Sequence, residues 1–524
     1  MAAAALVAGV AWAGAAYRRQ SLSSDLQAIF DGMVRQSRIT IAGVAVVSVV
    51  IAGVFATRSV AGADASGYVS EAAMLSRGEL IFVDDLADLR RGFDAYLTSP
   101  LGWRPASDTT QAPTYPPGLP LLMAVPHAIA GLDGAASVVA VSAALAVLAT
   151  GMLAARLSGG VAGILAAILL AFTPVFLFQS IQPMSDVPVT AVWMLCFAWI
   201  QAGGRYDTVA GLACAMAVLI RPNLAPLAIV PLWMAHRRAW FAAPVAIAGV
   251  MLAALQQHWY GSPFRSGYGS TDELFALANI APNAARYASW TLATAPMTLL
   301  GVLGMFRFRQ DRRARGLTAF ACLVVAAYLV YAVFDEWSYL RFLLPALAAV
   351  TVLAAGELAA WIDRVPGGMK LVVLFAIALG VSSTGVAMAR ERDTFSLADQ
   401  LARIERVAAD IRSTTPASAV LVTGEQSGSM RYASGRSILR WEAATPDALR
   451  ASFAALDRAS RPVFIVLDAF EEPLFRSKFA GVPESALDWP PVVEAGTARR
   501  TRVWRLSDRE RFLRGDTIDT RRLP

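Results

Sequence analysis

The acidic residue that first suggests chemistry is Asp64, a few residues beyond the end of the first long apolar run. A carboxylate there can act as a general base that takes the proton of an attacking hydroxyl. The alternative is structural, with Asp64 as the N-cap of a helix over residues 67–77 in which Tyr68, Ala72 and Leu75 form an apolar stripe. Spacing alone leaves both interpretations open.

Arginines near the ends of other apolar runs are candidate ligands for an anion. Arg265 lies in the segment YGSPFRSGYG, whose glycines and proline predict an irregular loop that can present backbone N–H groups and a guanidinium to a phosphate. Arg341 and Arg221 follow, and Arg104, beside Trp103, is a further candidate. The alternatives are an exposed turn arginine for Arg265 and snorkelling to lipid headgroups for Arg341 and Arg221.

Asp186 and the aromatic residues Trp337 and Tyr339 are candidates for substrate binding. Asp186 stands at the mouth of an apolar run, where an unpaired carboxylate in hydrocarbon would cost several kcal/mol, so it faces water, finds a partner or caps a helix. Trp337 and Tyr339 follow Asp335 and Glu336 and suit either stacking on a sugar or anchoring at the membrane surface.

Long apolar helices must position these residues. Of the 524 residues 56% are hydrophobic and 16% are charged, and the mean hydropathy is +0.51. A bilayer core needs about 20 apolar residues per helix. About eleven spans are predicted on that basis, at roughly 39–57, 134–155, 160–179, 187–203, 207–220, 223–236, 239–257, 288–306, 316–333, 342–361 and 371–389.

The positions of the basic residues predict which loops face the cytoplasm. If Arg35 and Arg38 are cytoplasmic, the later basic clusters fall on the same side, at Arg156, Arg205, residues 236–238, residues 307–315, Arg364 and Lys370. The apolar stretch 116–132 carries Pro117, Pro120, Pro126 and His127 and is predicted to be an interfacial or re-entrant helix. Asp64 and the C-terminus then lie outside the cytoplasm.

The sequence from about residue 392 onward changes character. An amphipathic helix over 397–411 precedes a strand at 419–423, a helix near 446–460 and a strand at 463–467, which predicts a small α/β domain. The turn 424–429 is interpreted as a strand-to-helix connection, with ligand binding as its alternative.

Several classes of protein are excluded. The net charge of +7 comes largely from short loops beside apolar runs, so no nucleic-acid partner is expected. The three cysteines lie in apolar runs and the three histidines lie far apart, so neither a disulfide framework nor a zinc site is indicated. There is no Walker loop. Residues 1–17 lack the basic start of a cleavable signal peptide and predict at most a short extra anchor.

A series of short motifs resembles the GT-C superfamily of membrane glycosyltransferases, specifically the protein mannosyltransferase and lipid A aminoarabinose transferase group. The similarity begins with the long loop that carries Asp64 and continues in the same order through later motifs, at TYPPGLPLL (114–122), QPMSDVP (182–188), Arg221-Pro222, YGSPFRSGYG (260–269) and RFLLP (341–345).

The resemblance implies an all-α GT-C-like bundle and a reaction that uses a sugar on a polyprenyl-phosphate carrier. It makes Asp64 the general base, and it implies inversion at the anomeric carbon. The family often has a second acid directly after the first, but here Ala65 follows, and Asp84 with Asp85 is the nearest acidic pair. A basic residue often precedes the paired prolines, but here Tyr115 does. Metal use and the subfamily therefore stay open, with no certain cofactor and a divalent metal at Asp84 and Asp85 as one option.

These observations give one overall prediction. An N-terminal segment (1–38) precedes a membrane domain (39–391) with a first outer loop at 58–116 and an extracytoplasmic α/β domain (392–524). We expect a glycosyltransferase of the bacterial inner membrane that acts on a glycan, lipid or protein hydroxyl. Asp64 is the base, Arg265, Arg341 and Arg221 bind the donor phosphate, and the substrate contacts are Tyr68, Asp186, Tyr115, Trp337 and Tyr339.

Two other classes of protein remain open. A transporter or lipid flippase fits the hydropathy but predicts charges deep within spans, which are nearly absent. A non-catalytic envelope scaffold would explain the outer domain without a role for Asp64.

Overall fold

The computed structural model describes residues 20–269, 274–496 and 499–523 and divides into two compact units. The helical unit consists of the chain up to residue 56, residues 136–253 and residues 269–395. The mixed unit consists of residues 57–135, 254–268 and 396–524. The extra anchor predicted for residues 1–17 lies outside the described residues.

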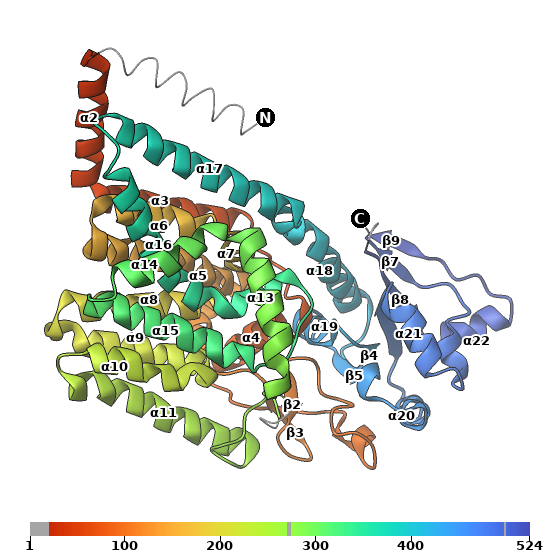
Figure 1. Ribbon diagram of the computed structural model, residues 1–524. Coiled ribbons are helices and arrows are strands. Elements are labelled where there is room, and N and C mark those ends of the chain that lie inside the picture. The colour runs from red at the N-terminus through yellow and green to blue at the C-terminus, as the bar shows by residue number, and fades with distance from the viewer. Residues whose placement is uncertain (1–19, 270–273, 497–498, 524) are drawn as a thin grey trace. The chain divides into compact units, whose positions relative to one another are not determined.

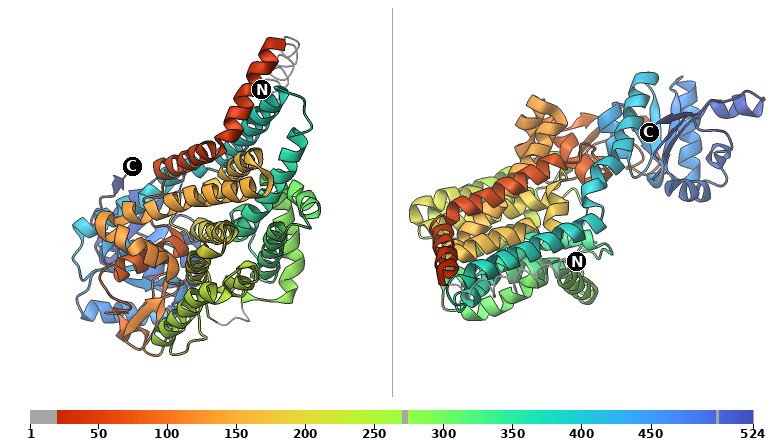
Figure 2. Two further views of the ribbon diagram at one scale, coloured as in Figure 1. Left: turned by 90° about the vertical axis from the view of Figure 1, so that its left-hand side faces the viewer. Right: turned by 90° about the horizontal axis from the view of Figure 1, so that it is seen from above.

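The helical unit is a bundle of apolar helices (Figures 1 and 2). Helix α16 (Leu344–Ile362) is enclosed by the other helices, and most of its residues are buried. Small residues permit close packing around it, because a Cβ on Gly304 would lie 2.4 Å from the Leu353 carbonyl oxygen of α16. The other helices of the unit are α2 (Gln20–Arg35), α3 (Ser37–Val54), α6 (Gly160–Ala171), α7 (Pro174–Ser180), α8 (Asp186–Ala202), α9 (Asp207–Ile220), α10 (Ile229–Met234), α13 (Ile280–Thr294), α14 (Leu300–Arg307), α15 (Arg312–Leu329) and α17 (Met369–Glu391), with most of α5 (Gly118–Ser158) and α11 (Arg238–Tyr260).

Each predicted apolar span falls largely on one of these helices or on a bent pair of them, except 223–236, which is divided between the 3-10 helix η3 (Pro222–Ala228) and α10. Within the described parts of the chain, five helices are long and apolar enough to cross a membrane, or up to seven if each of two bent pairs is one span. The bends are 64° between α6 and α7 and 113° between the 277–294 and 296–307 segments. The protein is therefore a multi-pass membrane protein, and the predicted number of eleven crossings stays a prediction.

The stretch predicted as an interfacial or re-entrant helix forms the first part of α5. The helix is interrupted at Ala130 and at Gly131, whose φ of +56° favours glycine. A Cβ on Gly134 would lie 1.9 Å from the carbonyl oxygen of Pro126, so the chain folds closely on itself after the break. Residues 118–129 are thus a separate helical segment from the long run that follows.

The first loop of the mixed unit combines one helix with a small sheet. Helix α4 (Gly62–Leu75) is followed by β1 (Phe82–Val83), β2 (Trp103–Pro105) and β3 (Thr110–Pro113), antiparallel in the order β1-β3-β2. Two glycines allow α4 to approach this sheet. A Cβ on Gly67 would lie 2.3 Å from the ring of Tyr115, and one on Gly102 (φ +90°) would lie 2.5 Å from the Cα of Gly67.

The C-terminal part of the mixed unit is a six-stranded sheet in the order β5-β4-β6-β8-β7-β9. Strands β4 (Val420–Thr423), β5 (Ser437–Arg440) and β6 (Val463–Asp468) are parallel, and β8 (Thr501–Arg505) pairs antiparallel with β6 and with β7 (Val493–Ala495). Strand β9 (Arg521–Leu523) completes the edge. Helices connect the strands: α18 (Leu397–Thr414), α19 (Ser427–Ser434), α20 (Pro446–Arg458), α21 (Glu471–Lys478) and α22 (Asp508–Leu513).

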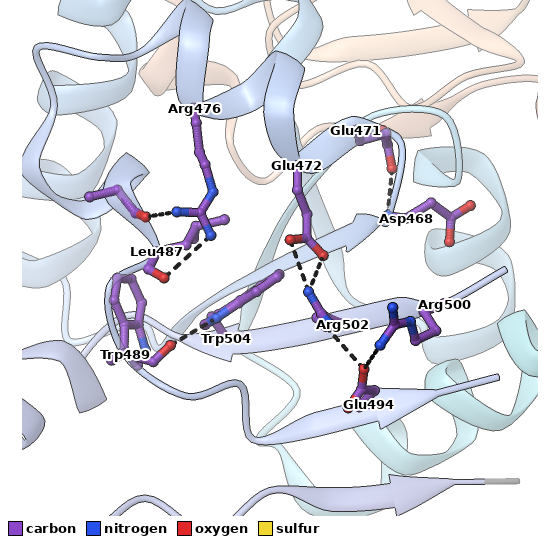
Figure 3. Close-up of polar contacts among 11 residues, drawn as sticks. Asp468, Glu471, Glu472, Arg476, Leu487, Trp489, Glu494, Arg500, Arg502 and Trp504 are labelled. Carbon is purple, nitrogen blue, oxygen red and sulfur yellow. Dashed lines mark hydrogen bonds and ion pairs between the residues drawn. The ribbon is translucent and has the colours of Figure 1, made fainter. Parts of the chain in front are cut away.

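A buried carboxyl group, Glu471, joins the carboxyl ends of two parallel strands. Its oxygens accept hydrogen bonds from the backbone N–H of Asp468 (2.9 Å), the backbone N–H of Glu425 (3.0 Å) and the Trp441 indole (3.2 Å). Nearby, Arg502 pairs with both Glu472 and Glu494 across the sheet (Figure 3). Burial raises the pKa of Glu471 to about 7, although these donors favour its ionised form.

Replacement of Gly67 by alanine tests the packing of α4. The added methyl group must displace the Tyr115 ring, and overpacking of this kind costs about 1–3 kcal/mol. We expect a lower midpoint of thermal unfolding for Gly67→Ala in detergent. Gly53→Ala, a helical position with open space around it, is the control. Equal midpoints for wild type and Gly67→Ala would contradict this packing.

The Glu471 carboxyl group predicts a dependence of stability on pH. Its folded pKa is raised above the usual 4.5, so its protonation stabilises the fold below about pH 4.5, and this contribution is lost as the pH rises through about 7. The unfolding midpoint should fall across this range for wild type and less steeply for Glu471→Gln. The exposed residue Glu510 supplies the control Glu510→Gln, which should keep the wild-type slope. The same slope in all three proteins would refute the assignment.

Candidate functional site

Asp64 lies in the first turn of α4, on the mixed unit. The prediction that it caps a helix beginning at Gly67 is wrong, because α4 begins at Gly62 and the N-cap position is Ala61, which makes no side-chain cap. The phenolic O–H of Tyr115 donates a hydrogen bond of 2.7 Å to Oδ1 of Asp64. This hydrogen bond fixes the orientation of the Asp64 carboxylate beside the ring of Tyr115.

Tyr115, which donates to this carboxylate, packs against two further tyrosine rings. The rings of Tyr68 and Tyr115 lie 4.8 Å apart, and Tyr268 meets Tyr115 edge to face at 5.7 Å. Tyr68 and Tyr115 are buried, whereas Tyr268 is 40% exposed. The structure thus brings together three residues singled out from the sequence, Asp64, Tyr68 and Tyr115, and adds Tyr268, which the sequence shows only as part of the YGSPFRSGYG segment.

The loop that carries Arg265 is attached to the strand end beside Tyr115. A Cβ on Gly267 would lie 1.9 Å from the carbonyl oxygen of Thr114, and Arg104 donates a 2.8 Å hydrogen bond to the carbonyl oxygen of Ser266. Arg265 itself is exposed. The fold therefore places Arg265 on a loop whose later residue, Tyr268, contacts the partner of Asp64.

A second carboxyl group, Glu71, occupies the same helix. It lies two turns after Asp64 and is completely buried, and neither of its oxygens has a hydrogen-bond partner among the described residues. Burial raises the pKa of Glu71 well above its usual value. Sequence reasoning did not single it out, because only the packed structure shows that it is enclosed.

Asp84 and Asp85, the acidic pair considered for metal binding, are already occupied by protein donors. Asp84 accepts hydrogen bonds from Thr98 and Gln111 and lies 3.6 Å from Arg90. Asp85 pairs with Arg461 and accepts a hydrogen bond from the hydroxyl of Ser437. These donors outweigh the effect of burial and hold the pKa of Asp85 below its usual value. The pair does not fit a metal ion. Within the described ranges no three His, Cys, Asp or Glu residues gather in a way that could hold one.

Asp186 and Arg221 form a buried ion pair in the helical unit. The guanidinium of Arg221 lies 2.5 Å from Asp186 and also donates to Ser185 and, at 2.9 Å, to the hydroxyl of Tyr328. Asp186 is the first residue of α8, after the N-cap Ser185, so the N-cap interpretation of Asp186 is wrong. The predicted contact of Asp186 with the substrate and that of Arg221 with the donor phosphate would each compete with this ion pair.

Arg341, Trp337 and Tyr339 also belong to the helical unit, in the 3-10 helix η6 (Trp337–Leu343). The guanidinium of Arg341 lies over the ring of Tyr339 at 5.0 Å and within 4.0 Å of the sulfur of Met184. The Trp337 ring packs against Phe178, and that of Tyr339 stacks on Phe334 at 4.0 Å. The predicted residues therefore form two groups, one in each unit.

The fold has clear relatives among solved structures. The sequence matches no protein-family model and no curated protein sequence. A crystal structure of ArnT from Cupriavidus metallidurans bound to undecaprenyl phosphate is 14% identical over 88% of this chain and 97% of that chain, with a TM-score of 0.59.

An oligosaccharyltransferase from Archaeoglobus fulgidus is also similar. Its apo form is 13% identical over 85% of this chain and 72% of that chain, with a TM-score of 0.54. A complex of the archaeal enzyme AglB with an inhibitory peptide and a dolichol-phosphate has a TM-score of 0.51 at 13% identity, over 85% and 71% of the two chains. At this identity the likeness is one of fold. The chain therefore shares its fold with ArnT and the archaeal oligosaccharyltransferase, the kind of fold that its motifs predicted.

Proposed function

We propose that this protein is a membrane glycosyltransferase that moves a sugar from a polyprenyl-phosphate carrier to a hydroxyl of a glycan, lipid or protein. One observation supports this most strongly. In a chain with the fold of ArnT, Asp64 stands in the first turn of a helix with the Tyr115 hydroxyl on one oxygen. The solved ArnT is bound to undecaprenyl phosphate, and the AglB complex holds a dolichol-phosphate, both polyprenyl carriers.

The proposed reaction is a single displacement with Asp64 as the base. Asp64 takes the proton of the acceptor hydroxyl as its oxygen attacks the anomeric carbon. The bond from that carbon to the phosphate oxygen breaks, and the polyprenyl phosphate leaves with the bonding electrons. Attack opposite the leaving group inverts the anomeric centre. Tyr115 holds the carboxylate in one orientation through its hydrogen bond.

The departing phosphate needs a cation, since negative charge develops on its oxygen. Arg265 is the first candidate because it is exposed, unlike Arg221, and lies on a loop fixed beside Tyr115. Arg341 is the second, in the helical unit. Arg221 already pairs with Asp186, so its proposed contribution is to hold the fold of that unit. Tyr68, Trp337 and Tyr339 remain proposed substrate contacts, and no step is assigned to a metal.

The proposed setting is a bacterial inner membrane that the chain crosses eleven times. The site and the C-terminal sheet then lie on the extracytoplasmic side, where lipid-linked sugars are presented. This proposal rests on the placement of the basic residues in short loops.

Asp64→Asn tests the proposed base. The amide cannot accept the proton, so we expect transfer from a radiolabelled polyprenyl-phosphate sugar to fall about 10²- to 10⁴-fold. Asp108→Asn changes an exposed acid of the same loop and should keep wild-type activity. Both variants must express and unfold as wild type does. Full transfer by Asp64→Asn would rule out the mechanism.

Arg265→Ala tests the proposed phosphate contact. A hydrogen bond to a charged group contributes about 1.5–3 kcal/mol, so loss of the guanidinium should lower kcat/KM for the lipid donor roughly 10- to 100-fold. Arg265→Lys, which keeps the charge without the planar fork, should recover part of this loss. Arg91→Ala, at an exposed arginine of the same unit, is the control. Unchanged kinetics in Arg265→Ala would show that Arg265 does not bind the donor phosphate and that another cation does.

A further inference from the structure

The turn that follows strand β4 is held firmly by the C-terminal part of the mixed unit. The backbone N–H of Glu425 donates to the buried carboxyl group of Glu471 at 3.0 Å. A Cβ on Gly424 would lie 2.5 Å from that same Glu471 oxygen and from the Trp441 indole nitrogen. Only glycine fits there, and the backbone on both sides of Glu425 is therefore fixed.

The same turn is also fixed against the first loop. A Cβ on Gly428 would lie 2.4 Å from the carbonyl oxygen of Leu101 and from the Ser66 hydroxyl oxygen. Ser427 accepts a 3.0 Å hydrogen bond from the backbone N–H of Leu101. Ser66 is two residues after Asp64 on α4, so helix α19 packs on the turn of α4 that carries the proposed base.

These contacts bring the side chain of Glu425 to the start of α4. A Cβ on Gly62 would lie 3.9 Å from Oε1 of Glu425, and Gly62 is two residues before Asp64. Glu425 is an exposed residue, and its carboxylate accepts no hydrogen bond from the described residues. An available carboxylate from the tail therefore stands beside the helix turn that holds Asp64.

We infer that Glu425 is the second acid of the proposed transferase site, a positioning residue that keeps the Asp64 carboxylate basic enough to take the acceptor proton. The inference rests on the proposed function.

The physical basis is repulsion between two carboxylates. A neighbouring negative charge makes ionisation of Asp64 less favourable and so strengthens it as a base. Partial burial of its carboxyl group, followed by the charges of Glu442, Asp468 and Asp64, raises the pKa of Glu425 itself, although the residue as a whole is exposed. Asp468 is paired with Arg403 at 3.1 Å and Glu442 with Arg440 at 3.3 Å, and the hydroxyl of Tyr115 donates a hydrogen bond to Asp64.

Glu425→Gln tests the inference through the pH dependence of kcat/KM. Without the second charge, the midpoint of the acid limb should move down by roughly 0.5 pH unit or more, and the plateau rate should fall about two- to tenfold. KM for the lipid donor should stay unchanged. Glu425→Asp, which keeps the charge, should retain an acid limb near that of wild type. Glu510→Gln is the control at an exposed glutamate of the same unit.

The outcomes separate the two proposals. If wild type releases polyprenyl phosphate and Asp64→Asn does not, but Glu425→Gln has the wild-type pH profile, the inference about Glu425 is wrong and the proposed function stands. If wild type transfers no sugar from any polyprenyl-phosphate donor, the proposed function itself fails. A thermal unfolding midpoint of Glu425→Gln equal to that of wild type shows that the shifted profile does not come from misfolding.

Discussion

The candidate site depends on one packing constraint, the contact of α4 with its neighbours at positions where no side chain fits. Gly67 leaves room for the Tyr115 ring, and Gly102 touches the backbone of Gly67. Gly428 brings α19 against Ser66, on the turn of α4 that carries Asp64. Protein interiors are close-packed, so a single methyl group at such a point moves its neighbours. These glycines therefore set where the side chains around Asp64 can lie.

Both units contain buried ion pairs, such as Arg403–Asp468 in the mixed unit, and the mixed unit also has exposed charges near the candidate site. In the helical unit the Asp186–Arg221 pair is buried and matched, and loss of one partner from such a pair costs about 3–5 kcal/mol. In the mixed unit, Glu425 carries a carboxylate with no hydrogen bond from the described residues, and Arg265 is exposed. A buried pair resists being broken because the remaining charge would be left without its partner, whereas an exposed charge can meet a substrate. This contrast is why the proposed chemistry centres on the mixed unit.

Local sequence patterns predicted the elements well. The apolar runs fall on helices, the strands expected at 419–423 and 463–467 coincide with β4 and β6, and Asp64 was singled out by its place after the first run. The N-cap interpretation of Asp64 failed because no strong capping residue marks the start of α4 at Gly62, so the spacing suggested a later start. Hydropathy located the helices better than it located the membrane crossings. In the described chain, length and composition allow five crossings, or up to seven if each bent pair of helices is one span.

Contacts between distant segments could not be predicted in the same way. The hydrogen bond from Tyr115 to Asp64 joins a motif residue to the proposed base, whereas the motif had suggested Tyr115 only as a substrate contact in place of a basic residue. Glu425 lies in a turn that reads as an ordinary strand-to-helix connection, and its place near Gly62 depends on glycine contacts across the mixed unit. Asp84 and Asp85 looked available for a metal because the sequence does not show their partners. Arg90 lies only a few residues after Asp84 but in no pattern that predicts a contact, and Arg461 lies far along the chain from Asp85.

The anomeric configuration of the product tests the account most directly. A donor of defined configuration, a polyprenyl-phosphate sugar, is turned over by the purified protein, and the new glycosidic bond is assigned by NMR. A single displacement with Asp64 as base predicts inversion of the anomeric centre in the transferred sugar. Retention would require a covalent or two-step route, and it would contradict the role given to Asp64.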